Sequence, residues 1–305
     1  MILTFVEQAE GVPAETSLEL LSLARDLAEQ TEVSDVEAVV FGDEGAGTAD
    51  TLGDHGVEVI HHVTHDDLDG YAPQAWGESI AQLARDLGPT AVVAPGSDRG
   101  HEVLSHVGAG LDLPMAANAT VVDVDGDGGS GEADDGWAVT RHRWGGSLVE
   151  HARLDAETKL LTAAEHEHAI EPVADATDPD VREFEPSLDE SHLQVQVTRV
   201  EESDVEGVPL GEARVVVSGG RGVGSAEDFD QLEELADLLD AAIGSSRAAV
   251  NEGWRPHDDQ IGLTGAKISP DIYIPCGISG AVQHMVGCKG AANILAINTD
   301  PEAAI

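Results

Sequence analysis

The sequence predicts an α/β protein of two domains, each with a mainly parallel sheet that helices cover on both faces. Its 305 residues favour two domains of ordinary size. Hydrophobic residues make up 41% of the chain, which is enough for two packed cores. Short apolar runs alternate with runs of helical spacing, and this order is typical of parallel sheets.

The first hundred residues alternate strands with helices. Strands are predicted at residues 2–6, 36–42, 57–63 and 91–95. Helices are predicted at residues 17–30, 75–87 and near 101–110. These repeated β-α-β units predict a parallel sheet in the first domain.

The middle of the chain has a different character. Residues 123–132 are rich in Gly and Asp and predict an acidic hairpin loop, because the ligand spacing of a calcium-binding EF-hand is missing. Paired strands are predicted at 139–144 and 147–154, and one more strand at 193–200.

A domain boundary is expected near residues 202–211. The acidic stretch 171–190 contains three prolines and indicates a connector that precedes the boundary. The domains are therefore placed at residues 1–205 and 206–305.

The second domain repeats a pattern of strand, glycine turn and helix. A buried strand at 213–218 leads into the glycine-rich run 219–225, and a strand at 272–275 leads into a second turn at 277–280. A capping box of Ser225 and Asp228 is expected to begin the first helix. Its apolar positions are Phe229, Leu232, Leu235, Leu239 and Ile243. A second helix is expected from Ala281, and a last strand at 292–297.

The two glycine turns favour a phosphate-bearing ligand at the carboxyl ends of the strands. Gly220, Gly222 and Gly224 have the placement of a dinucleotide-binding loop but not its G-x-G-x-x-G spacing, so a plain tight turn is the alternative. Arg247 is conspicuous beside Ser245 and Ser246 in a chain with few cations, although a surface ion pair would also explain it.

Charge indicates the solvent in which the protein works. The formal net charge is −44, with 59 acidic and 15 basic residues. This balance excludes a basic nucleic-acid footprint. Because the acids are spread along the whole chain, they suit a halophile's cytosol at molar salt, where the Debye length is about 3 Å.

A cytoplasmic location is expected. No run of about 18 apolar residues is available to span a membrane. The N-terminus has no basic region and reaches Glu7 early, unlike a signal peptide. Cys276 and Cys288 are predicted to be small buried residues.

Two histidine groups predict no metal site. One comprises His61, His62 and His65, and the other is the run 165–168. Neither has a metal-binding frame, so both are interpreted as solvated loops.

Five sequence segments together resemble a known family. They are Val217-Ser-Gly-Gly-Arg-Gly222, Ser246-Arg-Ala-Ala-Val250, Gln260-Ile-Gly-Leu-Thr-Gly265, Gly277-Ile-Ser-Gly-Ala-Val-Gln-His284 and Ala296-Ile-Asn-Thr-Asp-Pro-Glu302. In this order and at these separations they look like the FAD domain of electron-transfer flavoprotein α subunits. The first domain is similar only in its α/β layout and in the run 94–100 before the helix at 101–110.

The resemblance implies that the second domain is a dinucleotide (FAD)-binding fold, and it implies roles for individual residues. Arg247 would lie beside the isoalloxazine ring, where a fixed cation favours the anionic reduced flavin. Thr264 would place its hydroxyl at flavin N5, and His284 would donate toward the C2 carbonyl. Gln283 and Ser279 would serve the ribityl chain and the pyrophosphate. The implied FAD-binding residues are Arg221, Gly222, Ser246, Arg247, Gln260, Thr264, Gly265, Gly277, Ser279, Gly280, Gln283, His284 and Asn298. Among these, Ser246, Arg221 and Gly222 would face the phosphates, and Asn298 the adenosine.

The sequence departs from the family at two points. Leu263 stands where many members have Gln, so one polar contact near the ring is expected to be absent. Family members continue past the position of Ile305 with a further strand and an aspartate near the adenine, so the adenine end is expected to differ here.

The resemblance implies an electron carrier, not an enzyme that breaks a substrate bond. In the family, the α subunit forms a heterodimer with a separately encoded β subunit, a dehydrogenase reduces the flavin, and a membrane quinone oxidoreductase reoxidises it. Whether such a complex bifurcates electrons depends largely on a second nucleotide in the β subunit. Two alternatives are an NAD-binding α/β oxidoreductase and a nucleotide-binding regulatory subunit. The NAD alternative requires a ribose-binding acid where this chain has Arg247 and Ala248.

Overall fold

The chain folds into two compact units. The computed structural model describes residues 1–33, 35–68, 70–124, 136–144, 148–198, 210–211 and 213–305. Unit 1 comprises Met1–Arg143 and Leu148–Glu201, and unit 2 comprises Trp144–Ser147 and Glu202–Ile305. Both combine helices with a mainly parallel sheet, as predicted. None of the helices in the described residues has the length and apolar character needed to cross a bilayer.

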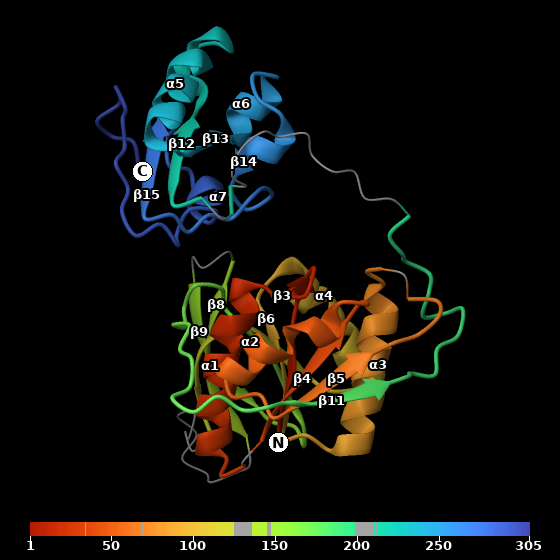
Figure 1. Cartoon of the computed structure of the whole chain (residues 1–305). Helices are drawn as coiled ribbons and strands as arrows, with labels where there is room; N and C mark the ends of the chain where they lie inside the picture. Colours follow the sequence, from red (N-terminus) through yellow and green to blue (C-terminus); the bar gives the residue numbers. More distant parts are fainter. Residues whose placement is uncertain (34, 69, 125–135, 145–147, 199–209, 212) are drawn as a thin grey trace. The chain divides into compact units, whose positions relative to one another are not determined.

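Unit 1 is built on one nine-stranded sheet (Figure 1). In spatial order its strands are β11 (Asp180–Phe184), β5 (Val59–Val63), β4 (Val36–Phe41), β1 (Ile2–Phe5), β6 (Ala91–Pro95), β10 (Lys159–Ala163), β7 (Met115–Asp123), β8 (Trp137–Arg143) and β9 (Leu148–Leu154). The strands from β11 to β7 pair in parallel, whereas β7, β8 and β9 pair antiparallel.

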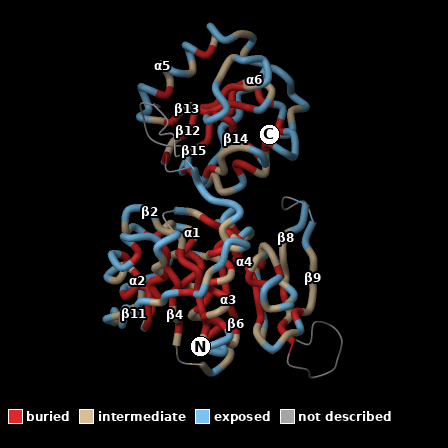
Figure 2. The backbone as a smooth tube through the Cα atoms, turned by 90° about the vertical axis from the view of Figure 1, so that its right-hand side faces the viewer, coloured by how far each residue is buried: buried red, intermediate tan, exposed pale blue. Residues whose placement is uncertain are grey.

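Helices cover both faces of this sheet because its central strands are apolar on both sides. On one face, α1 (Glu15–Gln30) packs its buried leucines against residues such as Ile2, Ala38 and Val40. On the other face, α3 (Pro73–Leu87) and α4 (Asp98–Leu111) pack against Leu3, Phe5 and Val39. Figure 2 shows the buried residues gathered in the strands. Smaller elements are the hairpin of β2 (Gln8–Ala9) and β3 (Val12–Pro13), the 3-10 helix η1 (Gly45–Thr48) and α2 (Ala49–Asp54).

The strands and helices predicted for the first hundred residues, and the paired strands β8 and β9, are confirmed within a few residues at their ends. The prediction that residues 171–190 are a connector is wrong in part, because β11 lies within them and pairs with β5. The pairing uses backbone hydrogen bonds, so the exposed polar side chains of β11 do not prevent it. The strand predicted at 193–200 is also wrong for its described part, 193–198. There, the Val195 N–H donates to Gln74 Oε1 and the Val197 N–H donates to Tyr71 O, and neither bond belongs to a ladder between paired strands. Most of the predicted loop at 123–132 lies outside the described residues.

Unit 2 has a four-stranded parallel sheet. Its spatial order is β14 (Gln260–Ile261), β13 (Ala242–Ser246), β12 (Val215–Gly219) and β15 (Ile272–Cys276). The helix α5 (Asp230–Leu239) packs on one face, and α7 (Val282–Met285) contributes to the core on the other. The remaining elements are α6 (Arg247–Asn251) and the 3-10 helices η2 (Arg221–Val223), η3 (Glu227–Phe229) and η4 (His257–Asp259).

Three details of unit 2 differ from the sequence prediction. Ile243 lies in β13, because α5 ends at Leu239. The predicted capping box lies at η3 and not at the start of α5, because the Ser225 hydroxyl accepts a hydrogen bond from the Asp228 N–H. Residues 292–297 form two parallel bridges to β15, Ile294 to Tyr273 and Ile297 to Cys276, and no continuous strand. The predicted domain boundary falls mostly outside the described residues.

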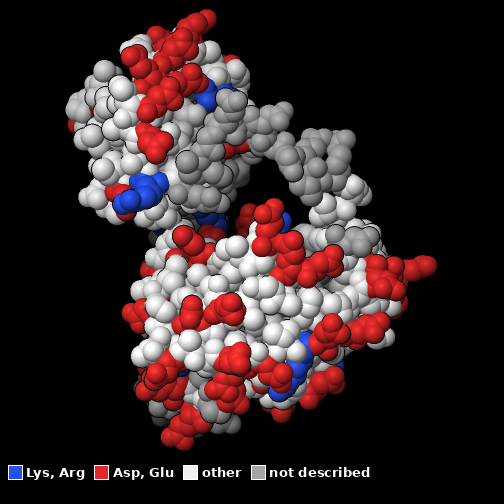
Figure 3. Space-filling model, viewed as in Figure 1, with Lys and Arg blue, Asp and Glu red and all other residues white. Residues whose placement is uncertain are grey.

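Acidic side chains are spread over the visible surface of each unit, with few basic ones among them (Figure 3). Several of those basic groups contact acids. Arg85 lies 3.0 Å from Glu78, and Arg214 lies 2.6 Å from Asp271. Because acidic residues outnumber basic ones 59 to 15, the excess of negative charge is the main electrostatic feature of the surface.

Close packing of α3 against α4 leads to a stability prediction. A Cβ on Gly77 of α3 would lie 2.4 Å from His106 Cβ, whereas a Cβ on Gly110 of α4 would meet only contacts of 3.5 Å or more. Both Gly-to-Ala changes gain up to about 1 kcal/mol of helix propensity. We expect Gly77→Ala nevertheless to lower the free energy of unfolding, since overpacking costs about 1–3 kcal/mol, and Gly110→Ala to raise it. Chemical denaturation of both variants measures this, and stabilisation by Gly77→Ala would contradict the packing.

Candidate functional site

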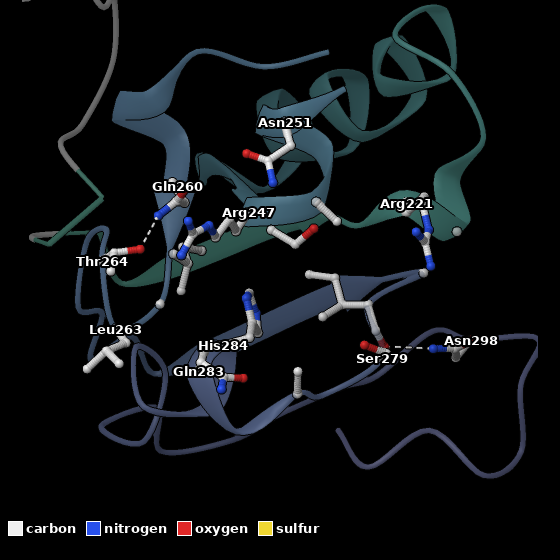
Figure 4. A pocket seen from close by; sticks show the side chains of 18 of the residues that line it. Arg221, Arg247, Asn251, Gln260, Leu263, Thr264, Ser279, Gln283, His284 and Asn298 are labelled. Atoms are coloured by element: carbon white, nitrogen blue, oxygen red, sulfur yellow. Dashed lines mark hydrogen bonds between the residues drawn. The ribbon is translucent and has the colours of Figure 1, made fainter. Parts of the chain in front are cut away.

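A cavity of about 720 Å³ lies within unit 2, at the carboxyl edge of its sheet. Each of the four strands ends at it. Arg221 and Gly222 follow β12, Arg247 follows β13, Gly262 follows β14 and Gly277 follows β15. In Figure 4, Arg221, Ser279 and Asn298 lie toward one end of the cavity, and Gln260 and Thr264 toward the other. Ligands bind at this edge in open parallel sheets because the strand ends, the turns and the helix starts meet there.

The two glycine turns contact each other through their backbones. Gly220 N–H donates to Cys276 O over 2.8 Å, and Gly222 N–H donates to Gly277 O over 3.0 Å. A Cβ on Gly222 would lie 2.8 Å from Gly277 Cα, and Gly277 has a φ of +62°. Glycine is therefore required on both sides, and it leaves the backbone open toward a ligand.

The loop after β14 carries polar side chains along one wall. Gly262 has a φ of +145°, and Leu263 N–H donates to Gln283 O over 2.7 Å, which ties the loop to α7. Gln260 Nε2 donates to Thr264 Oγ1 over 3.0 Å. Leu263 is 52% exposed and lines the cavity with an apolar side chain that can form no hydrogen bond.

A chain of hydrogen bonds connects the pocket to the core. His284 Nε2 lies 2.7 Å from the Tyr273 hydroxyl, which lies 2.6 Å from Ser218 Oγ. Burial raises the pKa of Tyr273, so it stays a phenol. Burial also lowers the pKa of His284, so its imidazole is neutral near pH 7. The second ring nitrogen, Nδ1, is buried without a hydrogen-bond partner in the described residues.

Two guanidinium groups give the pocket positive charge. Among the described arginines, Arg221 and Arg247 are two of three that make neither an ion pair nor a hydrogen bond. The alternative of a surface ion pair for Arg247 is therefore not supported. Asp300 also lines the pocket. Cations left unpaired in so acidic a chain favour an anionic ligand, because nearby carboxylates would otherwise neutralise them.

Comparison with known proteins agrees with this geometry. The sequence profile of the electron transfer flavoprotein FAD-binding domain matches residues 209–289, and that of the electron transfer flavoprotein domain matches residues 2–189. The chain is 30% identical to electron transfer flavoprotein subunit alpha of Thermoanaerobacterium thermosaccharolyticum, covering 99% of this chain and 89% of that protein. It is 36% identical to the subunit of the same name in Mycobacterium leprae, covering 99% and 90%. It is 34% identical to protein FixB of Clostridium saccharobutylicum, covering 99% and 88%.

The chain belongs to the electron-transfer flavoprotein α-subunit family. Like its relatives it is an electron-transfer protein with an FAD-binding domain, and FAD is its cofactor.

Eleven of the thirteen residues predicted for the flavoprotein's site line the cavity of unit 2. The exceptions are Gly265 and Gly280, which shape the backbone. A Cβ on Gly265 would lie 2.1 Å from Gln260 O, and one on Gly280 would lie 2.2 Å from Ile305 N. Contact between the eleven and FAD stays a prediction.

Several lining residues were not predicted. Most are neighbours of predicted ones, such as Ile261, Gly262 and Ile278. Asn251 is different, because it lies four residues after Arg247, at the end of α6. The i, i+4 spacing on a helix that starts at Arg247 is the signal that would have identified it. The unpredicted set is completed by Ala248, Leu263, Ala281, Thr299 and Asp300.

The other predicted clusters lie elsewhere. The solvated-loop interpretation of His61 and His62 is wrong, since both are buried on β5. His61 Nε2 lies 2.5 Å from Glu37 Oε2, and His62 Nε2 lies 2.8 Å from Gly42 O. The described residues contain no group of three or more His, Cys, Asp and Glu side chains placed to hold a metal ion. Cys276 and Cys288 are free and buried, as predicted, and burial raises the pKa of Cys288 to about 11.

The glycine contact leads to a second prediction. Gly277 (φ +62°) and Gly253 (φ +74°) both have left-handed backbones, so alanine costs about 1–2 kcal/mol of conformational energy at either position. Only at Gly277 would the new Cβ also collide, 2.6 Å from Gly222 C. We expect Gly277→Ala to lower the free energy of unfolding by about 1–3 kcal/mol more than Gly253→Ala and to weaken FAD retention. Thermal unfolding and flavin absorbance measure both effects. Equal behaviour of the two variants would mean that the turns are not in contact.

Proposed function

We propose that the cavity of unit 2 holds FAD and that the chain relays electrons as the α subunit of a heterodimer with a separately encoded β subunit. Dehydrogenases would be the electron donors and a membrane quinone oxidoreductase the acceptor. The observation that carries the proposal is the position of two unpaired guanidinium groups beside paired glycine turns, at the carboxyl edge of the family's FAD-binding domain. Unit 1 would act mainly as scaffold and partner interface.

The cavity has the properties that FAD requires. Its volume of about 720 Å³ is in the range of cofactor sites. The turns at Gly222 and Gly277 allow a backbone to approach a pyrophosphate without a clashing Cβ. Arg221 and the Ser279 hydroxyl lie at the same end and would bind its oxygens.

The residues at the other end would control the charge and position of the flavin ring. When bound, FAD supplies the redox chemistry itself. Arg247 would place a permanent positive charge beside the ring and favour added negative charge. Thr264 would hold its hydroxyl toward N5, oriented by the hydrogen bond from Gln260. Tyr273 would fix the imidazole of His284, so that a neutral ring presents its other nitrogen to a carbonyl.

The same charge distribution supports a proposal about the solvent. A net charge of −44 on 305 residues produces strong self-repulsion in dilute buffer. At molar salt, screening shortens the range of that repulsion to about 3 Å. We therefore propose that the protein works in the cytoplasm of a halophile.

The role of Arg247 leads to a prediction about redox potential. A charge-assisted contact with the reduced flavin is worth about 1.5–3 kcal/mol, and 59 mV corresponds to about 1.4 kcal/mol for one electron. We expect Arg247→Ala to lower the first one-electron reduction potential by on the order of 60–130 mV. Arg247→Lys should retain part of the effect, because its charge remains but the planar contact is lost.

Potentiometric titration of the flavin-loaded complex measures this difference. Arg214→Ala is the matched control, since Arg214 is exposed and paired with Asp271. A potential of Arg247→Ala within about 15 mV of the unmodified protein, roughly 0.4 kcal/mol, would make Arg247 an ordinary surface residue.

The heterodimer proposal leads to a prediction about flavin retention. Because the ring contacts proposed here come from a single sheet edge, the α chain alone should hold FAD poorly. A 1:1 complex with the β subunit at molar KCl should retain it. Near 0.1 M KCl, where the Debye length is about 10 Å, the complex should dissociate. Sedimentation and flavin absorbance at both salt concentrations test this. Equal FAD affinity with and without the β subunit would contradict the partner proposal, and an intact dimer at low salt would contradict the solvent proposal.

A further inference from the structure

We propose that unit 1 contains a second ligand site, at the carboxyl edge of its own sheet, for a nucleoside monophosphate. A cavity of about 280 Å³ lies there. Its lining includes Glu7 after β1, Gly42 after β4 and Arg99 in the first turn of α4, which follows β6. Three adjacent parallel strands therefore end at this cavity.

The topology of the two units is the same around their cavities. In unit 1, the first four long strands in the sequence, β1, β4, β5 and β6, have the spatial order β5-β4-β1-β6. In unit 2, β12, β13, β14 and β15 have the order β14-β13-β12-β15. In both sheets the second and third strands are added one after the other on one side of the first strand. The fourth strand is then added on the opposite side of the first. This reversal opens a crevice at the carboxyl ends of the first and fourth strands, where ligands bind in open α/β sheets.

Aromatic rings form one wall of the cavity in unit 1. Trp76 stacks on Phe41 with ring centroids 4.3 Å apart, and Tyr71 meets Trp76 edge-on at 5.1 Å. All three rings line the cavity. Because several rings converge on one small opening, a planar heteroaromatic group such as a nucleobase would pack well there.

Arg99 supplies the positive charge. It is the third of the described arginines that make neither an ion pair nor a hydrogen bond, and the other two line the cavity of unit 2. Its guanidinium lies 5.1 Å from the centroid of the Tyr71 ring. Two acids lie nearby: the Glu7 carboxylate accepts from the Ser97 hydroxyl and also interacts electrostatically with Arg99, and Glu102 accepts from the Tyr71 hydroxyl. An exposed guanidinium beside an aromatic cavity matches a ligand with a ring and a phosphate.

The size of the cavity limits the ligand. Its volume is well below the 720 Å³ of the cavity in unit 2, so a dinucleotide such as FAD would not fit. A mononucleotide is half of such a molecule. The local charge also limits the ligand, because the Glu7 carboxylate lines the same cavity and opposes an incoming phosphate.

Isothermal titration calorimetry of the full chain at molar KCl tests the proposal with AMP as the probe, with FAD kept in excess in both cell and syringe so that even weak binding keeps the cavity of unit 2 occupied. We expect one AMP to bind per chain, and adenosine and inorganic phosphate to bind at least about tenfold more weakly, because each lacks one of the two recognised groups. Arg99→Gln should weaken AMP binding by at least about tenfold. Glu7→Gln should bind AMP at least as tightly as the unmodified chain, because it removes a negative charge.

The matched control is Arg182→Gln, an exposed arginine on β11 that pairs with Asp180 on its own strand. It should bind AMP within twofold of the unmodified chain. The proposal would be overturned by an Arg99→Gln variant with unchanged affinity, or by absence of AMP binding to the unmodified chain. AMP binding that disappears when FAD is added would also overturn it, since the nucleotide would then occupy the cavity of unit 2.

Discussion

Two glycine turns meet backbone to backbone at the edge of the unit 2 sheet, and the cavity proposed to hold FAD depends on that contact. The Gly222 N–H donates to Gly277 O, and Gly277 has a positive φ, so a side chain is excluded on both sides of the contact. The register of β12 against β15, with Gly219 opposite Cys276, brings the turns together. The neighbouring strands β13 and β14 then place Arg247 and Gln260 along the same edge.

The positions of the unpaired arginines reflect the same arrangement of strand ends. The chain has 59 acidic residues, and surface arginines such as Arg85 and Arg214 contact them. Among the described arginines, the three without an ion pair or a hydrogen bond are Arg99, Arg221 and Arg247, and each comes shortly after a parallel strand and lines a cavity. The acidic surface and the cationic pockets are therefore separate features. We propose that the first governs behaviour toward salt and that the second governs which ligands bind.

Hydrogen bonds extend from the cavity of unit 2 into an apolar core. Ser218 on β12, Tyr273 on β15 and His284 on α7 form a buried chain of two hydrogen bonds that pass through the Tyr273 hydroxyl. Such a chain fixes the imidazole relative to two strands and keeps it neutral through burial. The glycine turns shape the backbone of the pocket, and this chain orients one of its side chains.

The sequence by itself determined the elements that local patterns encode. The buried strands β1, β4, β6, β12 and β15, the glycine turns and Arg247 could be predicted, because apolar runs and glycine spacing are local properties of the chain. Only the tertiary structure decided the elements that depend on a distant partner. β11 is a strand because it pairs with the backbone of β5. Residues 193–198 pair with no other strand in the described part of the chain and are therefore not a strand. His61 is buried where its ring nitrogen contacts the Glu37 carboxylate on β4. The cavity beside Arg99 likewise depends on three strand ends and on aromatic residues from separate segments, and no single window of sequence contains them. Pairing and burial are set by which segments meet in space, and that information is not local.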